Sequence, residues 1–290
     1  MSEPYAALAH LALNVERPRT EWLNMGDWSR ARTFPDACAA LARRLHDAAR
    51  LPPHARLLDV GHGCGDSLLL LLDERAPHTL HGVTSLAAHA QRAQARTGDR
   101  ATVHCADAVA WLAQTPHTYD AVLALDCAYH FADRPAFFRA AHAALAPRGT
   151  LALVDLVAAH PYPTDAAFGA SSLPAPTHPP RAWARAKHRV ACALSGTPPQ
   201  SFVSIDTYRT QLADAGFAPD AVEATDISAD VFPGFAHFLT HLGTGDERVW
   251  RAGSSLQLYA LRLFGRVVAQ WARGGNTGLV RCVLVVATKR

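Results

Sequence analysis

The sequence lacks several patterns that would assign its 290 residues to large classes of protein. Its six cysteines include no C-x-x-C pair, which argues against a zinc ribbon or a dithiol redox motif. No uncharged run reaches the roughly 18 residues that a membrane-spanning helix needs. The N-terminal residues contain no basic stretch followed by an apolar one, so no secretion signal is indicated. We therefore expect a cytoplasmic protein without stable membrane insertion.

The sequence also lacks a large excess of positive or negative charge. Charged residues make up 18% of the chain and the net charge is only +3, whereas nucleic-acid-binding proteins usually carry a clustered basic face. No nucleic-acid partner is expected. The sixteen histidines are scattered through a composition rich in Ala, Pro and Arg, which biased codon usage explains, so no metal site is expected either. Hydrophobic residues make up 49% of the chain, which is enough for a large core.

Apolar runs alternate with longer amphipathic segments through the first half of the chain. Strands are expected at 56–61, 79–85, 101–107, 119–127 and 149–157. Helices are expected before, between and after them, at 34–50, 66–76, 86–98 and 134–147. Such alternation is typical of a parallel sheet covered on both faces, and it predicts an α/β fold.

The pattern changes after the fifth predicted strand. Prolines and serines are frequent from Ala158 to Ser204, and no single element fits that stretch. Phe232, Phe235 and Phe238 then recur at helical spacing, which favours a core helix but also suits an apolar wall for a substrate. The amphipathic segment 254–272 favours packing on the domain, with contact to a membrane surface as the alternative.

The most informative segment is 57–72, which reads LLDVGHGCGDSLLLLL. An apolar strand ends at Asp59, three glycines follow at every second position (Gly61, Gly63 and Gly65), and a helix begins. Glycine allows a sharp turn and close approach of a ligand, and the helix N-terminus offers free N–H groups. The dinucleotide fingerprint is G-x-G-x-x-G with an acidic residue about 20 positions later, and neither feature is present. A carboxylate placed before the glycines suits an ammonium group better than a pyrophosphate.

This segment resembles the first motif of the class I S-adenosylmethionine-dependent methyltransferases, in particular the small-molecule, type 11-like enzymes. Three further segments resemble later motifs of that family in the same order, HGVTSLAAHAQRA, VHCADAVAW and YDAVLALDCAYHF. The resemblance implies a Rossmann-like, doubly wound, seven-stranded α/β sheet, mostly parallel with an antiparallel last strand. It also implies S-adenosyl-L-methionine as the cofactor.

The resemblance divides the chain into four parts. Residues 1–50 would form an N-terminal helical segment, and 51–157 the core that binds S-adenosylmethionine. A lid insertion would occupy 158–204. The remainder of the core would fill 205–290, with a helical insertion at about 229–275.

Roles for several residues follow from the same resemblance. Asp59 and the three glycines would hold the methionine portion of the cofactor. Asp107 would accept a hydrogen bond from the adenine amino group, and the backbone of Ala108 would donate one. Asp126 and Cys127 would line the cleft near the transferred methyl group.

The second motif departs from the commonest pattern of the family. Most members end the second strand with an acidic residue that binds both ribose hydroxyls, and no acidic residue stands here. The sequence GVTSL, followed by a histidine, is similar to the GVTLS variant of tocopherol, sterol and cyclopropane-fatty-acid enzymes. Thr84, Ser85 and His89 occupy the matching positions and would contact the ribose.

The segment EWLNMGDW, residues 21–28, resembles an aromatic patch that precedes the core of small-molecule methyltransferases. Asn24 and Trp28 would contact the cofactor on that interpretation. On the alternative interpretation, Trp28 only anchors this segment to the domain.

Methyl transfer requires a positioned nucleophile, and a general base if that nucleophile carries a proton. His130, just past the fourth strand, is the candidate base, and Tyr129 would orient the substrate. The alternative is that His130 only caps or packs. Trp183, Lys187 and His188 in the lid insertion are further candidates for substrate contact.

We therefore expect a methyltransferase acting on a small, apolar or lipid-like metabolite. A cyclopropane synthase-like enzyme acting on an acyl chain is one alternative, and a non-catalytic partner subunit with the same fold is another. Peripheral membrane contact and the oligomeric state stay open.

Overall fold

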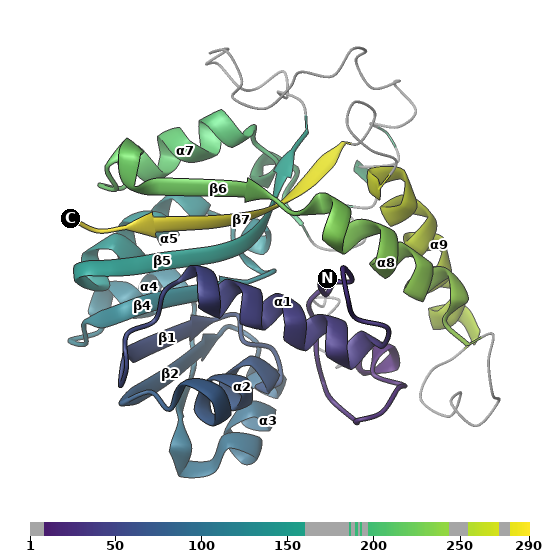
Figure 1. Cartoon of the computed structure of the whole chain (residues 1–290), viewed down its shortest axis with the longest axis horizontal. Helices are drawn as coiled ribbons and strands as arrows, with labels where there is room; N and C mark the ends of the chain where they lie inside the picture. The colour runs from purple at the N-terminus through teal and green to yellow at the C-terminus, as the bar shows by residue number, and fades with distance from the viewer. Residues whose placement is uncertain are drawn as a thin grey trace.

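A twisted seven-stranded sheet organises the chain (Figure 1). The computed structural model describes residues 9–159, 186, 189–190, 192, 197–243, 255–272 and 279–290. The strands, in spatial order, are β3 (Thr102–Cys105), β2 (Thr79–Thr84), β1 (Arg56–Val60), β4 (Tyr119–Leu125), β5 (Leu145–Ala158), β7 (Val280–Thr288) and β6 (Val222–Asp226). The first five are parallel, and β7 runs antiparallel between β5 and β6. The predicted fold class is confirmed.

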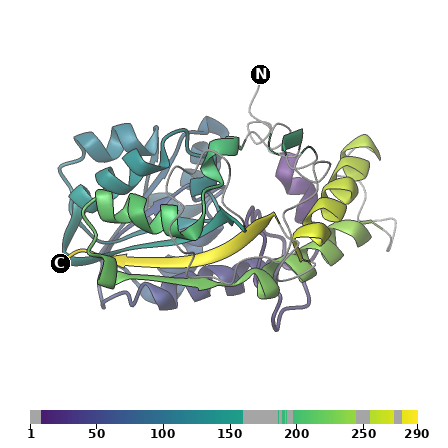
Figure 2. The same cartoon turned by 90° about the horizontal axis from the view of Figure 1, so that it is seen from above.

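Helices cover both faces of this sheet. One face packs against α1 (Phe34–Ala48), α2 (Asp66–Arg75), α3 (Ala87–Thr97) and α8 (Ser228–His241). The other packs against α4 (Ala108–Gln114), α5 (Arg134–Ala144) and α7 (Ile205–Asp214). Helix α9 (Ser255–Ala272) packs on α8, and the pair extends beyond one end of the sheet (Figure 2). Short 3-10 turns complete the described elements: Ala9–Leu13, Gly98–Arg100, Ala128–His130, Pro199–Ser201 and Pro219–Ala221.

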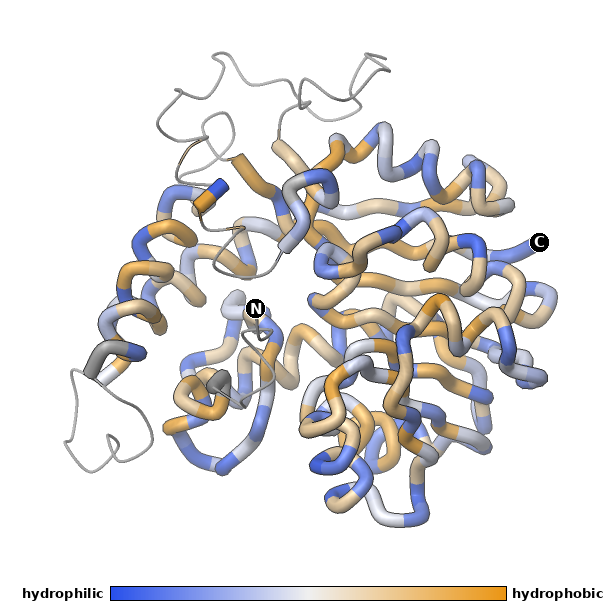
Figure 3. The backbone as a smooth tube through the Cα atoms, turned by 180° about the vertical axis from the view of Figure 1, so that it is seen from behind, coloured by the Kyte–Doolittle hydropathy of each residue, from blue (hydrophilic) through white to orange (hydrophobic). Residues whose placement is uncertain are grey.

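The central strands β1, β4 and β5 are largely buried on both faces, which explains their apolar character (Figure 3), whereas the edge strands β3 and β6 are partly exposed. Side chains alternate between two cores because successive residues of a strand point to opposite faces. In β1, Leu57 belongs to the core under α1, whereas Leu58 belongs to the core under α5. Leu123 and Val122 of β4 divide in the same way.

The order of the strands reverses between β1 and β4. The chain proceeds from β1 outward to β2 and β3, and then returns to β4 on the other side of β1. In open α/β sheets ligands bind in the crevice beyond the carboxyl ends of the strands at such a reversal. The turn after Val60 and the turn after Leu125 both lie there, and the thiol of Cys127 contacts the carbonyl oxygen of Val60 at 3.2 Å.

Some local expectations need correction. The helix expected at 134–147 ends at Ala144, and β5 begins at Leu145, because the chain pairs with Tyr119 of β4 there. Helix α4 was not expected, since seven residues are too few for a clear helical period.

The three phenylalanines of α8 lie in or against a core. Phe232 and Phe235 are buried, and Phe238 stacks on Phe34 with ring centroids 4.7 Å apart. Helix α9 packs Trp271 against Phe232, at a centroid distance of 5.6 Å. This packing agrees with the favoured interpretation of the 254–272 segment.

Helix α9 also leaves apolar side chains in solvent. Tyr259 and Leu263 are 64% and 47% exposed. Contact of this helix with a membrane surface stays a prediction. In the described part of the chain, no helix combines the length and the apolarity needed to cross a membrane.

An aromatic cluster lies at the amino end of β4, which is opposite to the carboxyl ends of the strands where the crevice lies. His81 of β2 shares a 2.7 Å hydrogen bond with the hydroxyl of Tyr119, and its ring lies 4.7 Å from that of His117. His104 and Trp111 complete the cluster. Burial and, to a smaller extent, repulsion from His117 and His104 lower the pKa of His81 to about 4. The imidazole of His81 is therefore neutral at pH 7.

We predict that His81 makes the fold sensitive to acid. An unfolded histidine takes up a proton near pH 6.5, whereas His81 in the fold resists protonation until about pH 4. The unfolded chain binds more protons between these values, so stability falls as the pH falls through this window. Urea unfolding at pH 7 and pH 5 should show that His81→Gln reduces the loss by about 1 to 2 kcal/mol. The exposed His78, replaced by glutamine, is the control, and equal losses in both variants would contradict the prediction.

Candidate cofactor site at the carboxyl ends of the central strands

The turn between β1 and α2 depends on glycine for both its conformation and its space. Gly61 and Gly65 have φ angles of +71° and +97°, which side chains rarely allow. A Cβ atom on Gly61 would lie 2.6 Å from the sulfur of Cys127, and one on Gly65 would lie 3.0 Å from the Cβ of Ala93. The turn therefore packs against both α3 and the segment that follows β4, and it presents its bare backbone at the carboxyl ends of the strands.

Asp59 lies beneath this turn with an unusual charge environment. Its side chain is only 1% exposed, and it accepts a hydrogen bond from the hydroxyl of Ser67 in the first turn of α2. Burial raises the pKa of Asp59 to about 7, and the bond from Ser67 offsets this only in part. No ion pair within the described residues includes Asp59. A buried carboxylate without a cation is a natural partner for the ammonium group of a ligand.

The start of α2 adds a site for a negative group. Gly65 stands at the N-cap position and offers no side-chain oxygen to cap the helix. The first N–H groups of α2 and the positive end of its dipole therefore lie next to Asp59. A ligand that carries both an ammonium and a carboxylate matches this pair of features.

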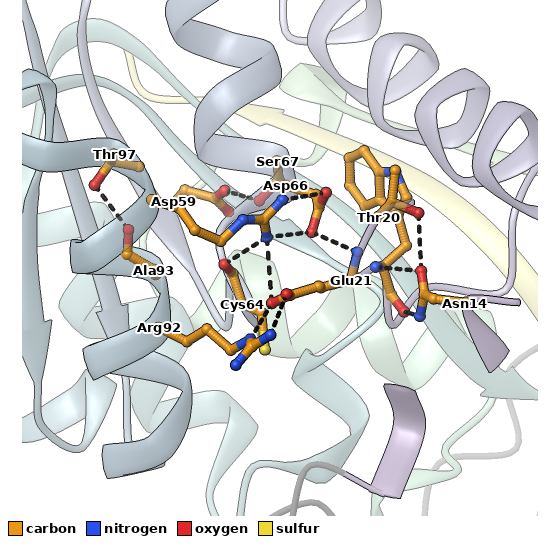
Figure 4. Close-up of polar contacts among 12 residues, drawn as sticks. Asn14, Thr20, Glu21, Asp59, Cys64, Asp66, Ser67, Arg92, Ala93 and Thr97 are labelled. Carbon is orange, nitrogen blue, oxygen red and sulfur yellow. Dashed lines mark hydrogen bonds and ion pairs between the residues drawn. The ribbon is translucent and has the colours of Figure 1, made fainter. Parts of the chain in front are cut away.

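Residues 20–25, here called the strap, cross the glycine turn and are tied to it by charged groups (Figure 4). Glu21 pairs with Arg92, and its backbone N–H donates to the carboxylate of Asp66 at 3.1 Å. Arg96 of α3 makes two bonds to Asp66, at 2.7 and 2.8 Å, and a third to the carbonyl of Cys64, at 2.8 Å. Because one guanidinium joins the turn and the start of α2, the shape of the turn is set before any ligand binds.

The other end of the strap reaches β4. The N–H of Met25 donates to Asp126 at 2.8 Å. Between the two ends, the side chain of Leu23 approaches Gly63 so closely that a Cβ there would lie 2.6 Å from Leu23 Cδ1. The strap thus covers the turn at Gly63.

Asn24 and Trp28 are engaged by the protein itself. Asn24 is buried, accepts from the N–H of Gly26 at 2.9 Å and donates to the carbonyl of Cys38. Trp28 packs on Gly234 of α8, stacks on Phe238 at 5.7 Å and donates its indole N–H to the carbonyl of Met25. These contacts favour the anchoring role for Trp28, and a cofactor contact by either residue stays a prediction.

The residues predicted to meet the ribose lie at the end of β2 and on α3. Thr84 and His89 are buried, whereas Ser85 is exposed. His62, in the glycine turn, was not expected to matter. It is buried on Gly82 of β2, and burial lowers its pKa to about 4. Residues from β1, β2 and α3 therefore meet at one place.

The predicted adenine contacts lie one strand farther out. Asp107 is exposed and caps α4, with its carboxylate accepting from the N–H of Ala110 at 2.9 Å. Ala108 is the first residue of that helix. One oxygen of Asp107 is thus committed to the cap, and its role toward a ligand stays a prediction.

The turn after β4 holds the candidate catalytic residues. Asp126 has a φ of +55°, and backbone strain of this kind is common at functional sites. Burial raises the pKa of Asp126 to about 7, and hydrogen bonds from Met25 and Tyr129 lower it only in part. Cys127 is half-buried, and the loss of solvent around its thiol raises its pKa and makes it a poor nucleophile.

Tyr129 and His130 follow in a short 3-10 turn, with ring centroids 4.4 Å apart. The Nδ1 of His130 lies 3.3 Å from the hydroxyl of Thr197. Burial lowers the pKa of His130 to about 4, so its imidazole is neutral near pH 7, which is the form that can accept a proton, but it is a weaker base than a free histidine.

Sequence reasoning missed the groups that stabilise the site. Glu21, Asp66 and Arg96 carry the charge network around the turn, and only their types, not their pairing, can be seen in the sequence. Trp183, Lys187 and His188 lie outside the described residues. Within the described ranges, no three His, Cys, Asp or Glu side chains are placed to hold a metal ion together.

Comparison with known proteins identifies the family. A model of the methyltransferase domain matches residues 30–222. The chain is 29% identical over 209 residues to erythromycin 3''-O-methyltransferase of Saccharopolyspora erythraea, a match covering 70% of this chain and 64% of that protein. The match therefore spans less than two thirds of that relative. The chain belongs to the methyltransferase-domain family.

Solved structures share the fold. The mycolic acid cyclopropane synthase CmaA1, complexed with SAH and CTAB, has a TM-score of 0.72 at 16% identity, covering 99% of both chains. The cyclopropane synthase MmaA2 of Mycobacterium tuberculosis has a TM-score of 0.68 at 17% identity and covers 99% of both chains. The [4+2]-cyclase SpnF has a TM-score of 0.67 at 18% identity, covering 98% of this chain and 94% of its own.

We predict that Arg96 contributes more to stability than Arg92, although both pair with Glu21. Arg96→Leu leaves the largely buried Asp66 without its cation and should cost about 2 kcal/mol in urea unfolding. Arg92 is 43% exposed, and Arg92→Leu should cost less than about 1 kcal/mol. Hydrogen exchange should show faster exchange of the Glu21 amide only in the Arg96 variant. Equal costs for the two substitutions would show that the network does not support the turn.

Proposed function

We propose that the protein is an S-adenosylmethionine-dependent methyltransferase that acts on a small, apolar or lipid-like metabolite. The observation that carries the proposal is the buried carboxylate of Asp59, which lies beside the start of α2 and pairs with no cation in the part of the chain that the structure describes. The amino-acid end of S-adenosylmethionine has an ammonium for Asp59 and a carboxylate for the N–H groups of α2. Family membership and this fit support the same cofactor.

The remaining predicted contacts extend from this point along the sheet edge. Thr84, Ser85 and His89 would hold the ribose, and Asp107 with Ala108 would hold the adenine. Their strands lie in the order β1, β2 and β3, so the proposed contacts follow the length of an adenosyl group outward from Asp59. Asp126 and Cys127, on the other side of β1, would face the reacting end.

When bound, the cofactor supplies an electrophilic methyl group on a sulfonium. His130 is the proposed base, and a substrate hydroxyl is the proposed acceptor because the curated relative is named as an O-methyltransferase. A substrate hydroxyl oxygen would take the methyl group while its proton passes to His130, and S-adenosylhomocysteine would be left as the second product. Tyr129 would orient the acceptor.

A cyclopropane synthase-like reaction is the second candidate, because two of the structures with the same fold catalyse it. The turn residues 126–131, DCAYHF, lack a carboxylate where the resemblance to that subfamily would place one. Cofactor with a trideuterated methyl group separates the reactions. Methyl transfer retains all three deuteriums in the product, whereas cyclopropane formation retains two.

Asp59 should control cofactor affinity. Asp59→Asn should weaken the binding of S-adenosylhomocysteine by about 2 kcal/mol, because it removes a charge-assisted bond in a buried site. In the native protein the affinity should rise from pH 5.5 to pH 7, since the bound ammonium requires an ionised Asp59 whose pKa is about 7 without ligand. Isothermal titration calorimetry measures both effects.

Asp99→Asn, at an exposed site, is the matched control for this measurement. It should change neither the affinity nor its pH dependence. A folded Asp59→Asn variant with native affinity would refute the proposed site.

His130 should affect turnover and not cofactor binding. His130→Gln should lower kcat by about 100-fold, a typical contribution of a general base, while the affinity for S-adenosylhomocysteine changes less than twofold. The assay would use labelled S-adenosylmethionine with a panel of hydroxylated apolar metabolites that includes a glycosylated macrolide. At saturating cofactor, kcat should stay level from pH 7 down to pH 5.5, because the pKa of His130 is about 4. Native turnover in His130→Gln would exclude His130 as the base.

A further inference from the structure

A buried polar trio lies behind the turn that carries Tyr129 and His130. It consists of Arg134 at the start of α5, Asp155 on β5 and Tyr208 on α7. Their exposed fractions are 3%, 0% and 0%, so a full charge pair is enclosed by the fold. Neither the sequence motifs nor the proposed chemistry uses these residues.

The three side chains contact one another closely. Arg134 Nη1 lies 3.2 Å from Asp155 Oδ2, and the hydroxyl of Tyr208 donates to the same oxygen at 2.9 Å. The guanidinium also lies 4.5 Å from the centre of the Tyr208 ring, in a cation–π arrangement. The other oxygen of Asp155 accepts from the N–H of Leu156 at 2.9 Å. Asp155 is therefore the centre of the trio.

The trio is connected to the turn from two sides. Strand β5 packs directly on the Ala128–His130 turn, and the backbone N–H of Tyr129 faces the carboxylate of Asp155 and lowers its pKa slightly. Arg134 follows His130 by four positions and begins α5, whose Phe137 packs edge-on against Phe131 of the turn at 5.0 Å. The carboxylate of Asp155 therefore pairs with Arg134 at one end of this segment and lies near the backbone of Tyr129 at the other.

Stability alone does not account for this arrangement. Desolvation of a buried ion pair can exceed its Coulomb attraction, and apolar replacements of such pairs are often neutral or stabilising. Burial raises the pKa of Asp155 in spite of Arg134, which shows that the charge is held at a cost. Strand β5 already pairs along its length with β4 and β7, so the sheet does not need the trio for its register. What the trio adds is a fixed position for the start of α5, which follows the turn directly and packs against it through Phe137 and Phe131.

We propose that Arg134, Asp155 and Tyr208 are positioning residues that hold the 128–131 turn and so fix the imidazole of His130 at the carboxyl end of β4. The proposal rests on the proposed role of His130. It predicts that the hydroxyl of Tyr208, buried on another helix, governs the rigidity of a turn that it does not touch.

Tyr208→Phe tests this, because it removes one hydroxyl and keeps the ring and the fold. Tyr119→Phe is the matched control. Tyr119 is also buried, and the substitution also removes a hydrogen bond, the one to His81 of β2. This bond lies at the start of β4, far from the 128–131 turn. Hydrogen exchange and NMR on the full chain would follow the Tyr129 amide and the His130 imidazole, assigned with His130→Gln. Tyr208→Phe should speed exchange of the Tyr129 amide at least tenfold and shift the His130 resonances. Tyr119→Phe should do neither.

Binding and kinetics complete the test. In Tyr208→Phe the affinity for S-adenosylhomocysteine should stay within twofold, while kcat falls about tenfold with KM unchanged. If that variant fails to fold, Arg134→Lys, which keeps the charge but not the planar contact with Tyr208, receives the same measurements.

Native exchange at Tyr129 and unshifted His130 resonances in a folded Tyr208→Phe variant would overturn the proposal. Failure of the proposed function has a different signature. Turnover would then survive His130→Gln, whatever Tyr208→Phe does to the turn.

Discussion

The carboxylate of Asp59 is the constraint on which the rest of the site depends. A buried charge without a cation is unfavourable, and Asp59 responds with a raised pKa and a bond from Ser67. The fold accepts this cost beside β4, where the strand order reverses and helix α2 begins. The ammonium group of a ligand would offset the cost of burying the Asp59 carboxylate. Binding of a charged amino-acid group is therefore favoured at this carboxylate.

Two further networks keep this place in shape without contributing to its charge balance. Arg96 holds the glycine turn and the strap on one side of β1, and Asp155 holds the His130 turn on the other side of β4. Both use a guanidinium and a carboxylate away from the proposed reacting atoms. The result is a sheet edge whose two central turns are held by separate sets of bonds. Asp126 joins them, because it follows β4 and binds the strap through Met25.

Much of the architecture could be predicted from residue patterns. The alternation of strands and helices and the glycine turn with its preceding acid are local features, and the family comparison agrees with them. The short helix α4 and the early start of β5 at Leu145 could not be predicted. A seven-residue helix has too few periods to be distinct, and the strand extends because β4 offers a partner. For Trp28 the pattern left two roles open, and only the packing on Gly234 and Phe238 favours one.

The chain alone specifies where the backbone must bend and where a carboxylate stands, because glycine conformation and hydrophobic period act over a few neighbouring residues. Which groups compensate that carboxylate is a property of the assembled fold. Met25 and Asp126 are 101 positions apart, and Tyr208 and Asp155 are 53 apart. Such pairs leave no local trace in the sequence, because their meeting depends on the order of strands in the sheet. Burial, and with it every shifted pKa at the site, arises only when the sheet and its helices have packed.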